Sequence, residues 1–475
     1  MALDEQKVNA IVEAVLSKLR QEGTTSLPGA PAIVHERQET GRRGVFPDID
    51  SAIKAAQEAQ VQLAAAGLEV RNHAIRAIRK FTLSHLETLS RMAVEETTFG
   101  RFEDKIGKNR LAATKTPGTE ILVPHAFSGD HGLTLTERAP YGVICAITPC
   151  TNATETILCN GIGMIAGGNT VVFNGHPAAK RCTVSLVRWL NEAMVAAGAP
   201  DNLLCTTPEP TVESANTLMR HPATALVVVT GGPAVVKAAM ATGKKCICAG
   251  PGNPPVLVDE TAKIDKAARD IIAGASLDNN IVCIVEKEII AVEAIADRLK
   301  HELIRAGAYH IKDSVVPRLT KLVVDGHDAN KRFVGKNPSV ILREVGIDIP
   351  DDVRIAFCEV DESHPLVQVE QLMPILPMFR VRNVEEGIAA GLRVEHGFRH
   401  TAVMHSLNVE NLHRYARVAN TSIFAKNAPS YVGLGLDGEG YSSFTIASPT
   451  GEGLTTAIHF TRERRCVLKD YFRIV

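Results

Sequence analysis

The chain lacks the features that would direct it to a membrane or to nucleic acid. No apolar run approaches the roughly 18 residues of a membrane-spanning helix, and the first residues show no secretory signal pattern. The formal net charge of the 475 residues is −1, so no overall field attracts polyanions. The length suggests about two to four domains. We therefore expect a globular cytoplasmic protein with neither a nucleic-acid nor a membrane partner.

Several familiar catalytic and metal-binding motifs are also absent. No GxxxxGK[ST], GxSxG or HExxH string occurs. The ten cysteines are scattered and none forms a CxxC pair, which predicts reduced core thiols and no metal site. A GxGxxG string occurs at Gly433, Gly435 and Gly438, but no apolar strand precedes it and no helix pattern follows it. We interpret it as a glycine-rich loop rather than a dinucleotide-binding fingerprint.

The N-terminal third of the chain is patterned as helices. Residues 2–20 carry apolar side chains at helical spacing, and a polar stretch rich in glycine and proline follows as far as Gly44. Such a tethered amphipathic helix either docks on a partner surface or packs on its own domain. Residues 48–111 form long Ala-rich amphipathic segments. These predict helices that cover a sheet and carry no obvious chemistry.

Between residues 141 and 258 strands and helices alternate. Five near-continuous apolar strands predict a parallel sheet covered on both faces, in a doubly wound domain. Such domains bind ligands at the carboxyl ends of their strands. Two of these ends stand out, TPCTN at 148–152 and TGGP at 230–233. Glycines before a helix let the backbone approach a phosphate, although a simple tight turn explains TGGP equally well.

The remaining sequence indicates a second α/β unit and two isolated strands. LTLTERA at 133–139 and the C-terminal residues 466–475 look like strands that pair with each other or with another subunit. The predicted division is an amphipathic helix at 1–20, a flexible linker at 21–44, a doubly wound domain at 45–255, a second α/β domain at 256–440 and a C-terminal segment with an isolated strand at 441–475. In fold class this is two doubly wound α/β domains with a small β element for oligomerisation.

The stretch SLDNNIVCIVEK contains the cysteine of greatest interest, Cys283. It follows the polar trio Asp278, Asn279 and Asn280 and lies in the apolar segment 281–285. A thiol at the end of a buried element can attack a carbonyl carbon, and the trio could position a substrate. Taken alone, however, a cysteine among apolar residues is usually a small core side chain.

A set of ordered sequence pieces raises the catalytic interpretation. ITPCTN, VVVTGGP, CAGPGNPPVLVD, SLDNNIVCIVEK, VEQLMPILP, HTAVMHS, TSIFAKNAPS and SFTIASPTGEG occur in this order between about Val45 and the C-terminus. In these pieces the chain resembles the aldehyde dehydrogenase superfamily. It is most similar to the CoA-acylating branch of bacterial microcompartments, which oxidises propionaldehyde or acetaldehyde. That superfamily binds NAD on a doubly wound domain without GxGxxG. The resemblance therefore implies a targeting helix at 1–20, an NAD-binding domain at 45–255, a catalytic domain at 256–440 and an oligomerisation strand within 441–475.

The resemblance implies roles for individual residues. Cys283 matches the nucleophile that forms a thiohemiacetal, and Asn152 matches the amide that holds the oxyanion with the backbone N–H of Cys283. The residues implied to bind the cofactor are Thr148, Pro149, Asn174, Thr230, Gly231, Gly232, Glu370 and Leu372. Glu370 matches the glutamate that holds the nicotinamide ribose. His400 or His405 could accept a proton, although structural histidines are the more common case.

Two departures from hydrolytic relatives are informative. Those enzymes use a glutamate to activate water against the thioester, and here that position falls on Ala249 or Gly250. Because a thiol needs far less help than water to deprotonate, the missing base favours CoA as the acyl acceptor. Asn174 stands where hydrolytic relatives have a lysine near the adenosine ribose, which leaves NAD favoured over NADP without deciding between them.

The predicted function is therefore the NAD-dependent oxidation of a short aldehyde, propionaldehyde first and acetaldehyde second, to an acyl-CoA inside a bacterial microcompartment. The expected cofactors are NAD and coenzyme A. The expected partners are a shell protein, through the N-terminal helix, and copies of the same chain in a dimer or tetramer. The alternatives are a hydrolytic dehydrogenase that gives free acid, a non-redox cysteine acyltransferase, and a scaffolding role in the compartment.

Overall fold

The computed structural model of the protein describes residues 43–475. The predicted N-terminal helix and nearly all of the predicted linker lie outside the described residues. Within 43–475 no helix combines the length and the apolar character needed to cross a membrane.

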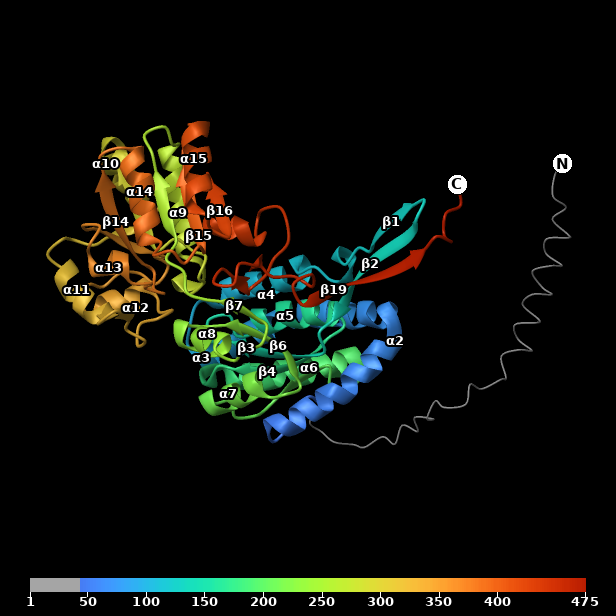
Figure 1. Ribbon diagram of the computed structural model, residues 1–475. Coiled ribbons are helices and arrows are strands. Elements are labelled where there is room, and N and C mark those ends of the chain that lie inside the picture. The colour runs from blue at the N-terminus through green and yellow to red at the C-terminus, as the bar shows by residue number, and fades with distance from the viewer. Residues whose placement is uncertain (1–42) are drawn as a thin grey trace, which may run out of the picture. The chain divides into compact units, whose positions relative to one another are not determined.

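Three helices open the described chain, as the Ala-rich pattern of residues 48–111 predicts. They are α2 (Ile49–Ser84), α3 (Leu86–Thr97) and α4 (Phe102–Lys115). Asp48 caps α2 by accepting a hydrogen bond of 2.7 Å from the backbone N–H of Ser51. The helix is interrupted at Gly67, whose φ of 79° is left-handed, and so it runs along the five-stranded sheet in two segments (Figure 1).

The predicted five-stranded parallel sheet is confirmed. Its strands are β3 (Val143–Thr148), β4 (Thr170–Gly175), β5 (Leu204–Thr206), β6 (Thr224–Thr230) and β7 (Cys246–Ala249). Their order is β5-β4-β3-β6-β7, and each neighbouring pair is parallel. The helices between them are α5 (Glu155–Ala166), α6 (Lys180–Ala196), α7 (Val212–Arg220) and α8 (Pro233–Met240). The strands after β3 are added first on one side of it (β4, β5) and then on the other (β6, β7), so the strand order reverses between β3 and β6, where a doubly wound sheet offers a ligand crevice.

A second parallel sheet has seven strands. They are β8 (Pro255–Val258), β9 (Glu288–Val292), β10 (Tyr309–His310), β13 (Ala356–Glu359), β14 (Ile375–Val381), β15 (Thr401–His405) and β16 (Ile423–Lys426), in the order β10-β13-β14-β9-β8-β15-β16. Its larger helices are α9 (Ile264–Ala275), α10 (Glu293–Arg305), α14 (Val384–Val394) and α15 (Val409–Ala419). Every strand pair in this sheet is parallel, which confirms the predicted second α/β unit.

A three-stranded antiparallel ribbon joins the two predicted isolated strands. It contains β1 (His125–Gly129), β2 (Gly132–Pro140) and β19 (Thr461–Lys469) (Figure 1). The C-terminal strand was predicted at 466–475, and this position is wrong. The strand begins five residues earlier and ends at Lys469, because its partner at that point is Gly132, the first residue of β2. Beyond Gly132 no residue of β2 remains to pair.

The remaining elements are short. They are α11 (Val316–Val323), α12 (Pro338–Arg343), α13 (Pro365–Gln368), β11 (Val324–Asp325), β12 (Asp328–Ala329), β17 (Ile446–Ala447), β18 (Gly453–Leu454) and the 3₁₀ turns η1 (Thr119–Ile121), η2 (Pro177–Ala179), η3 (Leu277–Asn280) and η4 (Ser430–Leu434). The GxGxxG string begins within η4 and continues as a loop, without the strand and helix of a dinucleotide fingerprint.

Candidate active site

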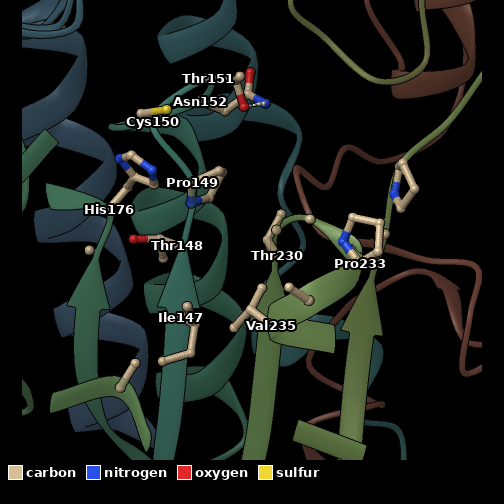
Figure 2. A pocket seen from close by; sticks show the side chains of 18 of the residues that line it. Ile147, Thr148, Pro149, Cys150, Thr151, Asn152, His176, Thr230, Pro233 and Val235 are labelled. Carbon is tan, nitrogen blue, oxygen red and sulfur yellow. Dashed lines mark hydrogen bonds between the residues drawn. The ribbon is translucent and has the colours of Figure 1, made fainter. Parts of the chain in front are cut away.

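A cavity of about 610 Å³ lies at the carboxyl edge of the five-stranded sheet. Figure 2 shows Thr148 at the end of β3 with Pro149 and Asn152 beyond it, and Thr230 at the end of β6 with Pro233 beyond it. The cavity brings together every site residue predicted from the sequence: Thr148, Pro149, Asn152, Asn174, Thr230, Gly231, Gly232, Cys283, Glu370 and Leu372. These residues come from both parallel sheets and their loops.

Cys283 lies on a loop rather than on a strand. The loop leaves η3 and ends where β9 begins. Before it, Asp278, Asn279 and Asn280 have φ values of 50°, 53° and 68°, so three consecutive non-glycine residues are left-handed. Asparagine and aspartate tolerate this conformation best among residues with a Cβ, but it still costs free energy at each position. The surrounding structure must therefore hold the loop in place.

Buried ion pairs fix the first of these three residues. One carboxylate oxygen of Asp278 lies 2.9 Å from Nζ of Lys105 and 2.6 Å from Nζ of Lys108, both on α4. The other oxygen accepts a 2.8 Å hydrogen bond from the backbone N–H of Arg101. Burial alone would raise the pKa of Asp278, but the two lysines hold it below its ordinary value. Gly100 is required here, because a Cβ would lie 1.8 Å from the Asp278 carboxylate.

Asn279 and Asn280 are held by hydrogen bonds within the protein. The Asn279 amide accepts from Nε of Arg101 at 2.7 Å and donates to the carbonyl of Gly335 at 2.9 Å. The buried Nζ of Lys287 donates to both the backbone and the side-chain oxygen of Asn280, each at 2.7 Å. The trio does not line the cavity. The suggestion that it positions the substrate is therefore wrong, and these side chains instead shape the loop that carries Cys283.

The Cys283 thiol is half-buried, and its pKa is raised well above the ordinary value. Burial, followed by the negative charge of Glu370, raises its pKa to about 12, whereas Lys287 and Lys108 oppose the rise. Glu370 also has a raised pKa, because burial outweighs the effect of Lys287. Its Oε1 accepts a long 3.4 Å hydrogen bond from the N–H of Gly252. Thiol and carboxyl thus share one partly desolvated space.

Polar groups in the cavity wall lack partners within the described residues. Oδ1 of Asn152 and Oγ1 of Thr148 are buried without a hydrogen bond. The Asn152 amide nitrogen has a single long contact, 3.5 Å to Oγ1 of Thr151. Buried polar atoms are nearly always satisfied in native proteins, so unpaired ones in a cavity wall indicate a ligand. The Asn152 amide is therefore free to donate to a substrate oxygen.

The turn after β6 suits a phosphate group. Gly231 and Gly232 line the cavity and lead directly into α8, which has Pro233 in its first turn. A Cβ at Gly232 would meet no atom within 4 Å, so the backbone there is open to the cavity. The first N–H groups of a helix attract anions, which fits the diphosphate of NAD. On the neighbouring side, the Asn174 amide accepts from Oγ of Ser214 at 2.6 Å.

The two histidines of RHTAVMHS lie at opposite ends of β15. His400 precedes the strand, and Gly252 separates it from Cys283. A Cβ added to Gly252 would lie 2.9 Å from the His400 ring and 2.7 Å from the carbonyl oxygen of Cys283. His405 ends the strand, about 16 Å away, with Nδ1 3.9 Å from a carboxylate oxygen of Asp270. Burial lowers the pKa of both rings to about 3, so both are neutral. Of the two, His400 is the one near the backbone of Cys283, and its Nε2 is buried without a partner in the described chain.

The cavity wall at Ala249 and Gly250 has no side chain that could act as a base to activate water. Ala249 and Gly250 line the cavity at the position where hydrolytic relatives are expected to have a glutamate. Among the described residues that line the cavity, Glu370 is the one carboxylate.

Comparisons with known proteins agree with this geometry. A model of the aldehyde dehydrogenase family matches residues 34–313. An acetylating acetaldehyde dehydrogenase of Salmonella typhimurium is 44% identical over 480 aligned residues, covering 100% of both chains. The structure of Rhodopseudomonas palustris propionaldehyde dehydrogenase with bound CoA and an acylated cysteine is 51% identical, with a TM-score of 0.89 over 90% of this chain and 98% of that one.

A further similar solved structure is that of an enzyme from a bacterial microcompartment. The propionaldehyde dehydrogenase of the Clostridium phytofermentans fucose utilisation microcompartment is 49% identical, with a TM-score of 0.90 over 91% of this chain and 100% of that one. These relatives confirm the resemblance to CoA-acylating enzymes that the sequence pieces indicate. By its sequence, by its two parallel sheets and by its similarity to these relatives, the chain belongs to the aldehyde dehydrogenase family.

Proposed function

We propose that the chain converts a short aliphatic aldehyde, NAD and CoA into an acyl-CoA and NADH, with Cys283 as the nucleophile. Propionaldehyde is the preferred substrate and acetaldehyde the second. One observation carries this proposal. The thiol, the free Asn152 amide and the Glu370 carboxyl line one cavity, and that cavity has no carboxylate at Ala249 or Gly250.

The residues of the chain have distinct parts in the first half of the reaction. The Cys283 thiol transfers its proton to the Glu370 carboxylate in the same cavity, its sulfur bonds to the carbonyl carbon, and the carbonyl oxygen gains negative charge. The Asn152 amide and the backbone N–H of Cys283 donate to that oxygen, and each such donor is typically worth about 3–4 kcal/mol in the transition state. NAD, when bound, accepts the hydride. Glu370 positions the cofactor ribose, and a thioester remains on Cys283.

The second half of the reaction transfers the acyl group. The CoA sulfur bonds to the thioester carbon, the bond to the Cys283 sulfur breaks, and the thiol proton of CoA moves to a base. We assign this base to His400, whose neutral ring has a free Nε2 and lies beside the Cys283 loop. Because a thiol has a pKa near about 8.5, against about 15.7 for water, a weak base is sufficient for CoA but not for hydrolysis.

We assign different roles to the predicted domains on the basis of the two sheets. Residues 45–255 would bind NAD, since they supply the β3 and β6 ends. Residues 256–440 would supply catalysis, since they contain Cys283, Glu370 and His400. Residues 441–475 would contribute to oligomerisation through β19.

Omitting CoA tests the proposed function. With propionaldehyde and NAD, the complete enzyme should form NADH continuously in the presence of CoA, with stoichiometric propionyl-CoA. Without CoA it should give one turnover per active site and then stop. His400→Gln should retain this single turnover and lose the CoA-dependent phase, whereas His405→Gln serves as the control for folding. Sustained NADH formation with propionate as the product in the absence of CoA would contradict the proposal.

The proposal extends to partners. The β19 strand is exposed along nearly its whole length, with apolar Val467 63% exposed, so the ribbon offers a surface for a second copy of the chain. The predicted helix at 2–20 would bind a shell protein of the compartment that the relative's name indicates. Deleting residues 1–20 should leave kcat in solution unchanged and abolish co-purification with shells. Undiminished co-purification would contradict the targeting role.

A further inference from the structure

Lys287 is a buried cation to which the proposed chemistry gives no part. It is 2% exposed and stands immediately before β9, shortly after Cys283 in the chain. Among residues 43–475 its Nζ donates to uncharged acceptors: the backbone and side-chain oxygens of Asn280, each at 2.7 Å, and the carbonyl oxygen of Val282 at 3.4 Å. A buried charge without an ion pair costs free energy, so an apolar side chain of similar length would suit stability better. We therefore expect Lys287 to have a role beyond support of the fold.

The carbonyl of Val282 belongs to the peptide bond that precedes the nucleophile. This carbonyl and the N–H of Cys283 are the two ends of one peptide group, and because the group is planar and trans they point in opposite directions. Cys283 lines the cavity, whereas Val282 and Lys287 are not among the described residues that do so. The N–H of Cys283 is thus directed away from the buried ammonium. It donates to no other residue in the described chain, which leaves it free for an oxyanion.

The orientation of this peptide depends on few contacts. Besides Lys287, the Val282 carbonyl accepts from the backbone N–H of Val285 at 3.3 Å. Both hydrogen bonds are long and individually weak. The ammonium adds an attraction between its charge and the carbonyl dipole, which is strong in a buried, weakly polarisable environment. If the peptide rotated by half a turn, its carbonyl oxygen would face the developing oxyanion, and the donor would be lost.

Lys287 has a second effect, on the thiol itself. Its positive charge opposes the rise in the pKa of Cys283, so its removal would lower the fraction of thiolate. Glu286 and Glu288, both buried, flank Lys287 in the chain, and the charge of Glu370 also acts on it. A change in the thiolate fraction alters every reaction of the sulfur by the same factor. A change in the oxyanion donor alters only attack on a carbonyl carbon.

We propose that Lys287 is a positioning residue of the oxyanion hole, which holds the Val282–Cys283 peptide with its N–H towards the substrate oxygen and polarises that N–H. The proposal rests on the proposed function, in which Cys283 attacks an aldehyde. Lys105 provides a matched control. It is also a buried lysine that supports the Cys283 loop, but its Nζ donates to the carboxylate of Asp278 and not to this peptide.

Two reactions of the same thiol test the proposal. With p-nitrophenyl propionate, the Cys283 sulfur bonds to the ester carbon through an oxyanion and p-nitrophenolate leaves. With iodoacetamide, the sulfur bonds to a saturated carbon and iodide leaves, so no oxyanion forms. Both rates are measured on the complete protein without NAD or CoA, from the absorbance of p-nitrophenolate and from the mass of the Cys283 peptide. The ratio of acylation to alkylation is independent of the thiolate fraction.

Lys287→Met should lower this ratio by about 100-fold, the typical loss for one oxyanion donor, while NAD affinity is retained. Lys287→Gln, which removes the charge but keeps the site polar, should lower it by about tenfold or more. Lys105→Met should keep the wild-type ratio, even where both rates fall.

An unchanged ratio in a folded Lys287 variant, or an equal fall in Lys105→Met, would overturn the proposal. Failure of both Lys287 variants to fold would also overturn it, because Lys287 would then be a structural residue. Failure of the proposed function gives a different result, since the ester would then not acylate Cys283 in the wild type and no propionyl-CoA would form from propionaldehyde.

Discussion

Replacing Cys283 by alanine should abolish aldehyde-dependent NADH formation, lowering kcat by about 10⁴-fold or more. The loss is expected to be this large because hydride leaves from a tetrahedral carbon that exists only after the sulfur has bonded to it. The remaining cavity would still bind aldehyde and cofactor, so NAD binding should change little. Steady-state absorbance of NADH, with cofactor affinity measured separately, tests both expectations.

Cys150 provides the matched control. It is also a partly exposed cysteine in the cavity wall, and it precedes Asn152 in the turn after β3. Cys150→Ala removes a similar sulfur from the same space without touching the proposed nucleophile. It should retain turnover of the same order as the wild type. If Cys283→Ala remains active while Cys150→Ala is inactive, the nucleophile has been assigned to the wrong cysteine.

Asp278→Asn should destabilise the protein and reduce its activity, although Asp278 does not line the cavity. The substitution keeps the shape of the side chain but removes the charge that pairs with Lys105 and Lys108. Breaking one side of a buried ion pair typically costs about 3–5 kcal/mol, because the remaining charge is left desolvated. Glu155, 3.3 Å from Nζ of Lys108, compensates only part of this loss. The melting temperature and kcat should therefore fall together.

Two further variants distinguish the loss of the buried ion pairs from the general effect of replacing an aspartate. Asp265→Asn removes an exposed aspartate that pairs with Arg269 on the surface of α9, and it should leave the melting temperature unchanged. Adding Lys105→Met to Asp278→Asn removes one of the stranded charges, so the double variant should melt above the single one. A wild-type melting temperature for Asp278→Asn would show that the ion pairs do not hold the loop.

The two sheets were predictable because their signal is local. Strands buried on both faces produce near-continuous apolar runs, and the helices between them have their own period, so both parallel sheets follow from pattern. The end of β19 did not follow, because a strand ends where its partner ends. Nothing in the apolar residues after Lys469 reports that β2 begins at Gly132.

The cavity residues were predictable from ordered motifs, whereas the residues that support them were not. Lys105 and Lys108 lie 173 and 170 positions from Asp278 and occur in a helix with no obvious chemistry in its sequence. Lysines on an amphipathic helix are usually solvated, and their burial here depends on a partner from a distant loop.

The most direct test of the account is the mass of the peptide that contains Cys283 after an acid quench. Enzyme mixed with propionaldehyde and NAD in the absence of CoA should carry one propionyl group on this peptide, and adding CoA should remove it and yield propionyl-CoA. An unmodified Cys283 peptide in enzyme that has formed one equivalent of NADH, or a propionyl group that CoA fails to remove, would contradict it.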